Sequence, residues 1–549
     1  PGRKCTLGRN QPKRLDQVKS IRPTPPNNLK TPFTLYITWI PALFDVRSLS
    51  FIALKTKIMV YTDEEQPLLR IISHDQDSNC QTNDEGTLDF EPRDPEDPRN
   101  WRPAFKWSIV LLLALMAFTV TFTCIGVVPV ASQIVEDLDG KHASSSTSAL
   151  LVTIWELGEA AGPLLIAPLS EVFGRYPVMN ACNIGFIAAT VLAIGSQNSK
   201  VFIAARMLTG LAVASNVLNP AIIGDMFESD QRGSAMSLIM LAPLIGGAIG
   251  PAISGAIAQA MGWRQILYIA LGLAVLCELS FLMYFRETYK LAILRRRIAV
   301  SHRDSCGPEE SLDNDTRHKN ILKLWHSVTR PFAVLFGSKV LMLLSVFASV
   351  SFSYFYVISV SLPGILVDLY DFTPTQTGSA FVSFSIGSFI SVMVCNFSLD
   401  RIYIRLRRRS NAEAKPEYRL PLGILGAFLL PLSITSYGWI AQYKLSVFLL
   451  LASVSLMGFA LLLTMVPLSA YVVDACGIYS ASAMTGVIVT RCLAGTFFPL
   501  TTAPLVKHLG YGWGFTCFGT LSLSLSIVPI LILRFGHNWR QSSDFTKDA

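Results

Sequence analysis

Two glutamates lie in an apolar stretch of the sequence, where charged side chains are costly. Glu156 and Glu159 are the only charged residues of the stretch 148–169. Residues three positions apart share one face of a helix, so the two carboxyl groups are expected to be neighbours near the middle of this stretch. Two carboxylates this close in a low dielectric resist being charged together, so one of them is expected to hold a proton.

Such a pair predicts a proton carrier or a site for a cationic substrate, because ionisable groups inside membranes are expensive and mark functional sites. The alternative is a structural pair bonded to polar groups of a neighbouring helix. Glu159 is favoured over Glu156 because small residues follow it directly in the sequence. Arg206, in the apolar stretch 201–224, is either the partner of the pair or a buried structural cation.

Other residues in apolar stretches could also do chemistry. Asp474 and Arg491 are expected to pair across the second half of the chain as a structural gate. Contact with a neighbouring helix, or extension towards water, would account for Glu278. In the run "FASVSFSYFYVISVSLPG", Tyr354 or Tyr356 is expected to face a cavity, because a buried phenol needs a partner. Aromatic walls suit amphipathic or cationic organic molecules, and ordinary helix packing is the alternative.

The composition requires these residues to sit in a membrane. Of the 549 residues, 51% are hydrophobic and only 15% are charged, whereas globular proteins average about 25% charged residues. A bilayer-spanning helix needs about 20 apolar residues. Twelve such spans are predicted: 107–131, 148–169, 177–196, 201–224, 234–259, 265–286, 340–366, 377–398, 420–440, 444–472, 482–506 and 513–535. An all-α membrane protein excludes nucleic-acid readers and soluble dehydrogenases.

The distribution of charge predicts the topology. Lys and Arg are dense in the central polar segment and in "DRIYIRLRRRSNAEAKPEYR", whereas the loops predicted to lie outside hold single Lys or Arg residues. By the positive-inside rule both termini are cytosolic, with the plasma membrane as the expected location and the vacuolar membrane as the alternative. The expected segments are a non-native or disordered extension (1–58, with Met59 as the start), a disordered cytosolic tail (59–106), two pseudo-symmetric six-helix bundles (107–286 and 336–535), a cytosolic loop (287–335) and a cytosolic tail (536–549).

The ten cysteines show no metal-binding spacing. Those within spans are interpreted as small buried hydrophobic residues; they are Cys124, Cys182, Cys277, Cys395, Cys492 and Cys517. No G-x-x-x-x-G-K-[ST] motif is present, which argues against an ATP-driven pump. The sequence therefore predicts neither a metal nor a cofactor.

The segment "GPLLIAPLSEVFGRYPVMNA", between the second and third spans, resembles the G-x-L-a-D-r-x-G-r-r signature of the major facilitator superfamily. The resemblance implies a fold of two six-helix bundles. It also implies a charge-assisted latch of Glu171 and Arg175 at a tight turn made by Gly174, which closes the cytosolic side. "GDMFESDQRG", after the fourth span, adds Asp225 and Arg232 to this predicted cytosolic gate.

The fifth span contains "APLIGGAIGPAISGAIAQ", which resembles the antiporter motif G-P-x-x-G-P-x-x-G-G of that superfamily. Small residues every third or fourth position make a face that another helix can approach closely. Proline kinks are tolerated because neighbouring helices satisfy the freed carbonyls. The motif implies a bent helix that seals the bundle on one side; its residues here are Gly246, Gly247, Gly250, Pro251, Ser254 and Gly255.

Three further segments resemble the fungal twelve-span drug:proton antiporters, above all the polyamine and multidrug exporters. They are "DPEDPRNWRPAFKW", "LVTIWELGEAAGPLLIAPLSEVFGR" and "YSASAMTGVIVTRCLAGTFFPL". The resemblance implies a monomeric, non-enzymatic exporter that uses the proton gradient to move amphipathic drugs, toxins or secondary metabolites. Transport of a polyamine or another specific solute is the first alternative. A nutrient sensor on the same scaffold that transports nothing is the second.

Overall fold

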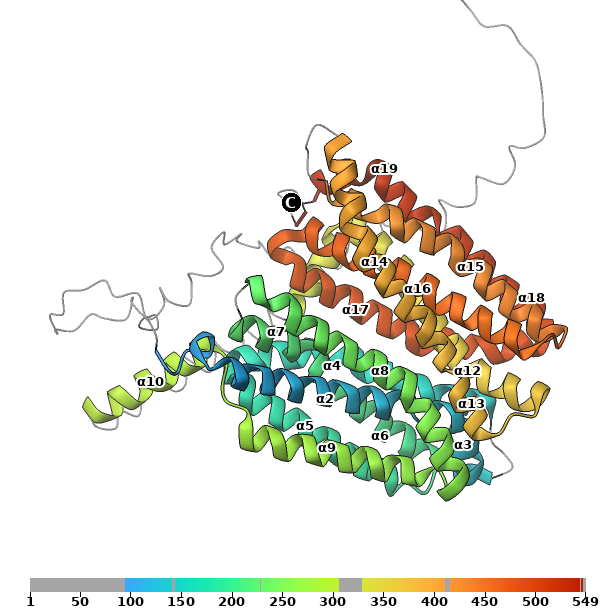
Figure 1. Ribbon diagram of the computed structural model, residues 1–549, viewed down its shortest axis with the longest axis horizontal. Helices are drawn as coiled ribbons and strands as arrows, with labels where there is room; N and C mark the ends of the chain where they lie inside the picture. Colours follow the sequence, from blue (N-terminus) through green and yellow to red (C-terminus); the bar gives the residue numbers. More distant parts are fainter. Residues whose placement is uncertain are drawn as a thin grey trace, which may run out of the picture. The chain divides into compact units, whose positions relative to one another are not determined.

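The computed structural model describes residues 94–140, 144–227, 229–305, 328–409, 415–543 and 545–546. The expected extension 1–58, the start at Met59 and most of the tail 59–106 lie outside the described residues. Within the described ranges every regular element is helical (Figure 1).

The first half of the chain forms one group of helices. Apolar residues dominate each of them, and short polar or glycine-containing turns join them. The helices are α2 (Pro103–Ile125), α3 (Ala131–Asp139), α4 (Ser145–Phe173), α5 (Arg175–Ile194), α6 (Ser199–Leu211), α7 (Ser215–Met226), α8 (Ser229–Met261), α9 (Arg264–Tyr284) and α10 (Lys290–Ser305). The predicted fourth span is α6 and α7 together, separated by a break at 212–214.

The second half forms a second group. Its helices are α12 (Lys339–Tyr370), α13 (Pro374–Ala380), α14 (Val382–Arg409), α15 (Leu420–Gln442), α16 (Val447–Cys476), α17 (Ser480–Phe497), α18 (Thr502–Leu525) and α19 (Ile527–Gln541). Among the described residues, eleven helical stretches are long and apolar enough to cross a membrane. The last of these, Ser480–Gln541, has 62 residues. At 1.5 Å per residue this stretch is about three times as long as a bilayer is thick, so it is too long to be a single span. Its backbone turns at Gly510 (φ 75°), so it supplies the eleventh and twelfth spans.

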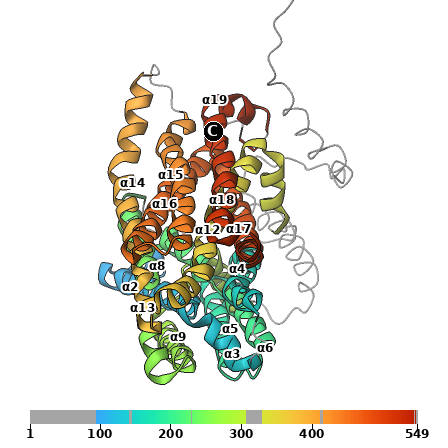
Figure 2. The same cartoon turned by 90° about the vertical axis from the view of Figure 1, so that its right-hand side faces the viewer.

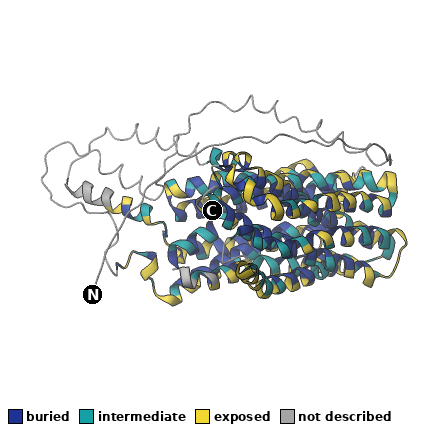
Figure 3. Ribbon diagram, turned by 90° about the horizontal axis from the view of Figure 1, so that it is seen from above, coloured by how far each residue is buried: buried dark blue, intermediate teal, exposed yellow. Residues whose placement is uncertain are grey.

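The surface and the core match a membrane environment. Large apolar side chains such as Phe448 and Met283 are exposed, and exposed residues line the outer sides of the helices while buried ones lie between them (Figure 3). Such outward apolar surface suits lipid tails. One buried apolar cluster draws residues from both groups of helices, including Phe122 of α2 and Leu430 of α15.

Two contact regions join the bundles. In one, α8 packs against α13 and α14; in the other, α4 packs against α17 and α12 (Figure 2). The first is very close, because a Cβ at Gly255 would lie 2.2 Å from the Pro374 carbonyl oxygen, and one at Gly378 would lie 2.1 Å from the Pro251 carbonyl oxygen. Only glycine at both positions allows this crossing.

The predicted loops are more helical than expected. The predicted loop 287–335 contains α10 and most of the short helix Val328–Gly337, and α14 continues to Arg409 through residues predicted to be loop. Charge keeps α10 and the end of α14 out of a bilayer, but it does not prevent helix formation, because Arg is a good helix former. Val328–Gly337 is apolar but too short to span a bilayer. Hydropathy therefore located the spans correctly and understated the helices outside them.

Candidate functional site

A buried hydrogen bond joins the two bundles at the middle of the fold. The Tyr356 hydroxyl, on α12, donates to Glu156 Oε1, on α4, over 2.6 Å. Glu156 is 2% exposed and Tyr356 is 5% exposed. Close packing fixes α4 here, since Gly158 and Gly210 allow α4 and α6 to approach until backbone meets backbone. The second carboxylate oxygen, Glu156 Oε2, has no hydrogen-bond partner among the described residues.

The structure brings the two predicted glutamates together, as the three-residue spacing predicted. A carboxylate oxygen of Glu156, one of Glu159 and the sulfur of Cys492 lie within 4.8 Å of one another. Glu159 is half-buried and accepts a hydrogen bond of 2.7 Å from Asn216 Nδ2, on α7. Cys492, on α17, is fully buried.

Arg491 belongs to this cluster and not to the predicted gate. Its guanidinium lies 4.2 Å from the centre of the Phe352 ring, it is adjacent to Cys492 in the chain, and its positive charge acts on both glutamates. The predicted pairing of Arg491 with Asp474 is wrong. Asp474 instead accepts from Arg419 Nε over 2.9 Å. The reason is depth: Asp474 is close to the end of α16, whereas Arg491 lies well inside α17.

Arg206 is a structural cation. It donates to the carbonyls of Thr123 and Cys124, each over 2.8 Å, and its guanidinium lies 4.8 Å from the centre of the Trp155 ring. These carbonyls belong to the last turn of α2, where backbone acceptors lack helical partners and favour a cation. Arg206 makes no ion pair with the described carboxylates. Its contacts therefore favour the structural cation over the partner of Glu156 and Glu159.

Tyr354 and Tyr356 have different surroundings. The Tyr354 hydroxyl donates to the Phe518 carbonyl over 2.8 Å, and its ring packs against the rings of Phe498 and Phe518. Residues two positions apart are about 200° apart around a helix, so the two phenols point to nearly opposite sides. Tyr354 is therefore a packing residue, so only Tyr356 remains for the expectation that one of the two faces a cavity, and for Tyr356 it stays a prediction.

A second charged cluster lies where α4 ends and α5 begins. Arg175 Nε is 3.4 Å from Asp225 Oδ2, and its guanidinium lies 4.7 Å from the centre of the Tyr289 ring. The predicted partner, Glu171, is exposed and makes no ion pair with Arg175 within 4.0 Å, so the ion pair of Arg175 is with Asp225 instead, and a role of this pair as a latch stays a prediction. The cause is that α4 ends at Phe173 and α5 leaves in a new direction, which turns Arg175 towards α7.

Sequence reasoning missed Glu287, which caps this turn. Its carboxylate accepts from the backbone N–H groups of Arg175 (2.8 Å) and Tyr176 (3.1 Å). An anion at a helix N-terminus is favourable. Gly174 has φ 99°, and a Cβ there would lie 2.3 Å from Glu287 Oε2, so the signature glycine serves both the turn and the cap. Arg232 donates to the carbonyls of Gly224 and Phe227 and holds the turn between α7 and α8.

Helix α10 is attached to the N-terminal segment at the same end. Arg297 makes two hydrogen bonds to Asp94, of 2.5 and 2.8 Å, and one of 2.6 Å to Glu96. The Arg297 guanidinium holds the pKa of Asp94 below its usual value. The contact therefore persists from neutral to mildly acidic pH and weakens only when the pH falls through that lowered value.

The small residues of α8 face two partners. Gly246 and Gly250 lie against Phe118 and Phe122 of α2, Ser254 lies close to Gly126 just after α2, and Gly255 faces α13. Gly247 is less confined, since a Cβ there would meet only a methyl group of Ile125, at 3.6 Å. Close packing is therefore present at Gly246, Gly250, Ser254 and Gly255 but not at Gly247, and a sealing role in transport stays a prediction.

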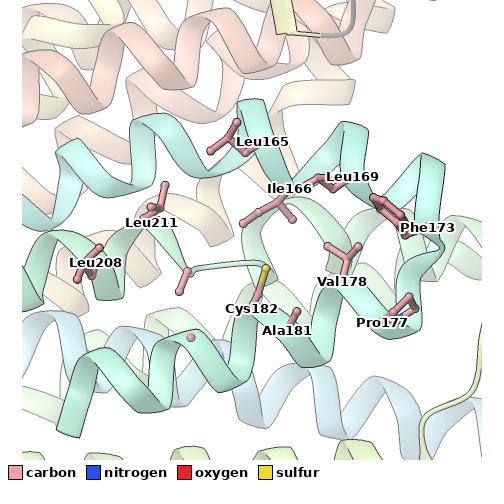
Figure 4. A pocket seen from close by; sticks show the side chains of 12 residues that line it. Leu165, Ile166, Leu169, Phe173, Pro177, Val178, Ala181, Cys182, Leu208 and Leu211 are labelled. Atoms are coloured by element: carbon pink, nitrogen blue, oxygen red, sulfur yellow. The ribbon is translucent and has the colours of Figure 1, made fainter. Parts of the chain in front are cut away.

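An apolar groove of about 600 Å³ lies between α4, α5 and α6 (Figure 4). Leu165, Leu208 and Phe173 line it and are exposed. None of the predicted site residues lines this groove. It therefore belongs to the lipid-facing side of the first bundle and not to the glutamate cluster.

Comparisons with known proteins agree with this architecture. Residues 110–499 match the sequence profile of the Major Facilitator Superfamily. The chain is 29% identical to "Efflux pump radE" of Floropilus chiversii over 88% of this chain and 93% of that protein. It is 31% identical to "MFS-type transporter penM" of Penicillium rubens over 84% and 91%. The crystal structure of a D-xylose-proton symporter superposes with a TM-score of 0.58 at 16% identity, over 77% and 97%, which is a likeness of fold.

Proposed function

Because the chain belongs to the Major Facilitator Superfamily and is a multi-pass membrane transporter, we propose that it exports amphipathic organic molecules from a fungal cell in exchange for protons. One observation carries this proposal: the buried Glu156 carboxyl group of the first bundle is bonded to Tyr356 of the second. A group that can gain or lose a proton at this contact can link proton binding to the relative position of the bundles.

The surroundings of Glu156 give this link a physical basis. The charged carboxylate is attracted to Arg491 and accepts from Tyr356, both on the second bundle. A proton on the unpartnered Oε2 would cancel the attraction to Arg491. The charged and the protonated carboxyl group therefore hold the bundles together with different strength. If Glu156 binds a proton more tightly in one arrangement of the bundles, protonation shifts the equilibrium towards that arrangement.

We propose Glu156, and not Glu159, as the residue that exchanges the proton. Glu156 is buried at the contact between bundles, whereas Glu159 is half-buried and bonded to Asn216 of its own bundle. The position of Glu159 suits a role in passing the proton between Glu156 and the accessible side. Two carboxylates this close resist being charged together, which favours one shared proton.

The direction and the substrate class rest on two supports. The relative from Floropilus chiversii is called an efflux pump. The rings of Phe352 and Phe355 lie 5.9 and 5.0 Å from the Tyr356 ring, and aromatic walls of this kind suit amphipathic organic compounds. We place the transporter in the plasma membrane as a monomer with cytosolic termini, and we propose the proton gradient as its energy source without a cofactor.

Efflux from a transporter-depleted yeast tests the function. Cells that express the full chain are loaded with a panel of fungal toxins, spermidine and neutral amphipathic dyes, and export is followed with and without a proton uncoupler. Uncoupler-sensitive export of several amphipathic compounds supports the proposal. Export of spermidine alone would favour the specific-solute alternative. Export at the same rate with and without the uncoupler contradicts proton coupling. If the chain exports no compound of the panel, the assignment as an exporter is contradicted.

A further inference from the structure

Two glutamates and a cysteine from opposite bundles meet in one cluster, although the sequence separates them widely. A carboxylate oxygen from each of Glu156 and Glu159 and the Cys492 sulfur lie within 4.8 Å of one another. Carboxylate oxygens and cysteine sulfur are ligands that zinc takes in proteins. Spacing along the chain could not indicate this set, because α4 and α17 supply its members.

A second observation points to a ligand at this place. Glu156 Oε2 is buried and has no hydrogen-bond partner among the described residues, and leaving a buried acceptor of this kind unsatisfied is unfavourable. Gly495, on the same helix as Cys492, leaves room for about one atom beside this oxygen, since a Cβ there would make an ordinary van der Waals contact with it at 3.4 Å. The oxygen is therefore available to a small ligand.

The charges indicate what kind of ligand fits. Metal binding displaces the protons of its ligands, so two carboxylates and a thiolate around a bound ion carry three negative charges, of which the nearby Arg491 guanidinium offsets one. The remainder matches a divalent cation. A thiolate selects Zn²⁺ or Cd²⁺ over Mg²⁺ and Ca²⁺. Zinc bonds of about 2.0–2.3 Å place tetrahedral ligand atoms roughly 3.5 Å apart, so the three side chains need to move by only about 1 Å.

We propose that Glu156, Glu159 and Cys492 bind one thiophilic divalent cation, with Zn²⁺ as the natural example and water as the fourth ligand. Glu156 and Glu159 belong to the first bundle and Cys492 to the second. The bound ion joins the bundles, so it acts as an inhibitor of the movement between them and not as a cofactor. The proposed metal site does not depend on the proposed transport function, whereas the inhibitory effect of the bound ion rests on that function.

Direct binding to the purified full chain in lipid nanodiscs tests the site. Titration with Cd²⁺ is expected to give a thiolate-to-metal absorption band that saturates at one ion per chain. Zinc X-ray absorption is expected to show one sulfur at about 2.3 Å with nitrogen or oxygen ligands at about 2.0–2.2 Å. Cys492→Ser is expected to abolish the band. Cys517, on α18, is exposed, contrary to its interpretation from the sequence as a buried residue. Cys517→Ser is the matched control and is expected to keep the band.

Glu156→Gln keeps the thiol and removes one carboxylate ligand. It is expected to weaken Cd²⁺ binding at least about tenfold, the scale seen even when a group that only supports a metal ligand is lost. Glu278→Gln, at a buried glutamate bonded to Asn183, is the control and is expected to leave binding unchanged. A band that survives Cys492→Ser, or Cd²⁺ binding that is unchanged in Glu156→Gln, overturns the site.

The inhibitory role is tested in transporting vesicles. Zn²⁺ is expected to stop export by the unmodified chain and not by Cys492→Ser. A metal that binds without stopping export overturns only the inhibitory role.

Discussion

The Tyr356 hydroxyl oxygen lies 2.6 Å from Glu156 Oε1 across the contact between the two bundles, with the phenol as donor and the carboxylate as acceptor. Each residue comes from a different half of the chain, and both are buried. A hydrogen bond to a charged group contributes about 1.5–3 kcal/mol, so this single contact is large enough to bias which arrangement of the bundles is populated.

Tyr356→Phe removes this bond and keeps the ring. The loss is expected to lower uphill export about tenfold, since 1.4 kcal/mol corresponds to a factor of ten, while protein level in the membrane stays near normal. Export by vesicles with an imposed pH gradient measures it. Tyr354→Phe is the matched control, because its hydroxyl bonds to the Phe518 carbonyl within the second bundle, and it is expected to affect stability more than coupling. Equal export by Tyr356→Phe and the unmodified chain would contradict the role of the bond.

Gly255→Ala tests the crossing of α8 and α13. The new methyl group would lie 2.2 Å from the Pro374 carbonyl oxygen, so the two helices must separate. Overpacking costs about 1–3 kcal/mol, and the crossing is expected to open often enough to lower export severalfold. Crosslinking of paired cysteines introduced on α8 and α13 measures the separation. Gly247→Ala is the control, with its nearest contact at 3.6 Å. Crosslinking by Gly255→Ala at the unmodified rate would show that the crossing tolerates bulk.

Glu287→Gln tests the cap that sequence reasoning missed. The amide keeps one acceptor oxygen but loses the charge that faces the start of α5, an interaction worth about 0.3–1 kcal/mol when exposed and up to about 2 kcal/mol when partly buried. A fall of a few degrees in the melting temperature and faster hydrogen exchange in the first turn of α5 are expected. Glu171→Gln, at the exposed neighbouring carboxylate, is expected to change neither. Unchanged exchange at Arg175 and Tyr176 in Glu287→Gln would contradict the cap.

Arg297→Ala tests the attachment of α10 to the N-terminal segment. Loss of the bonds to Asp94 and Glu96 is expected to speed hydrogen exchange along Lys290–Ser305, and Arg296→Ala, with the same change of charge, is expected to have less effect. The lowered pKa of Asp94 means that the contact is complete above the usual Asp value of about 3.9. Protection of α10, corrected for intrinsic exchange, should thus be equal at neutral and mildly acidic pH. Protection that falls already at mildly acidic pH would be inconsistent with the lowered pKa.

The sequence predicted the spans well because hydropathy is a local property. It also placed Glu156 and Glu159 on one face, since the spacing of residues around a helix is fixed by helix geometry. It could not supply partners from distant segments. Arg491 was assigned to Asp474, whereas it lies beside the glutamates of the other bundle. Which helix faces which depends on the close approach at residues such as Gly158 and Gly255, and this is visible only in the folded chain.

The signature turn shows the same limit on a smaller scale. Gly174 and Arg175 were identified from the pattern, and the positive φ of Gly174 explains why the pattern contains glycine. The carboxylate that pairs with Arg175 was predicted from the neighbouring Glu171, but Asp225 from α7 takes that place. Glu287 gave no signal in the sequence, because a single carboxylate at the start of a polar segment is common. Only its contact with the start of α5 reveals its role.

Proton exchange at Glu156 is tested most directly by comparing uphill and downhill transport in proteoliposomes of the purified chain. With a substrate found in the yeast panel, Glu156→Gln is expected to lose transport driven by a pH gradient and to retain exchange of labelled for unlabelled substrate. The amide keeps the shape of the carboxyl group and an acceptor for Tyr356. Glu278→Gln serves as the control for a buried glutamate outside the contact. Loss of only the gradient-driven transport in Glu156→Gln is the predicted result; normal gradient-driven transport by this variant would contradict the account.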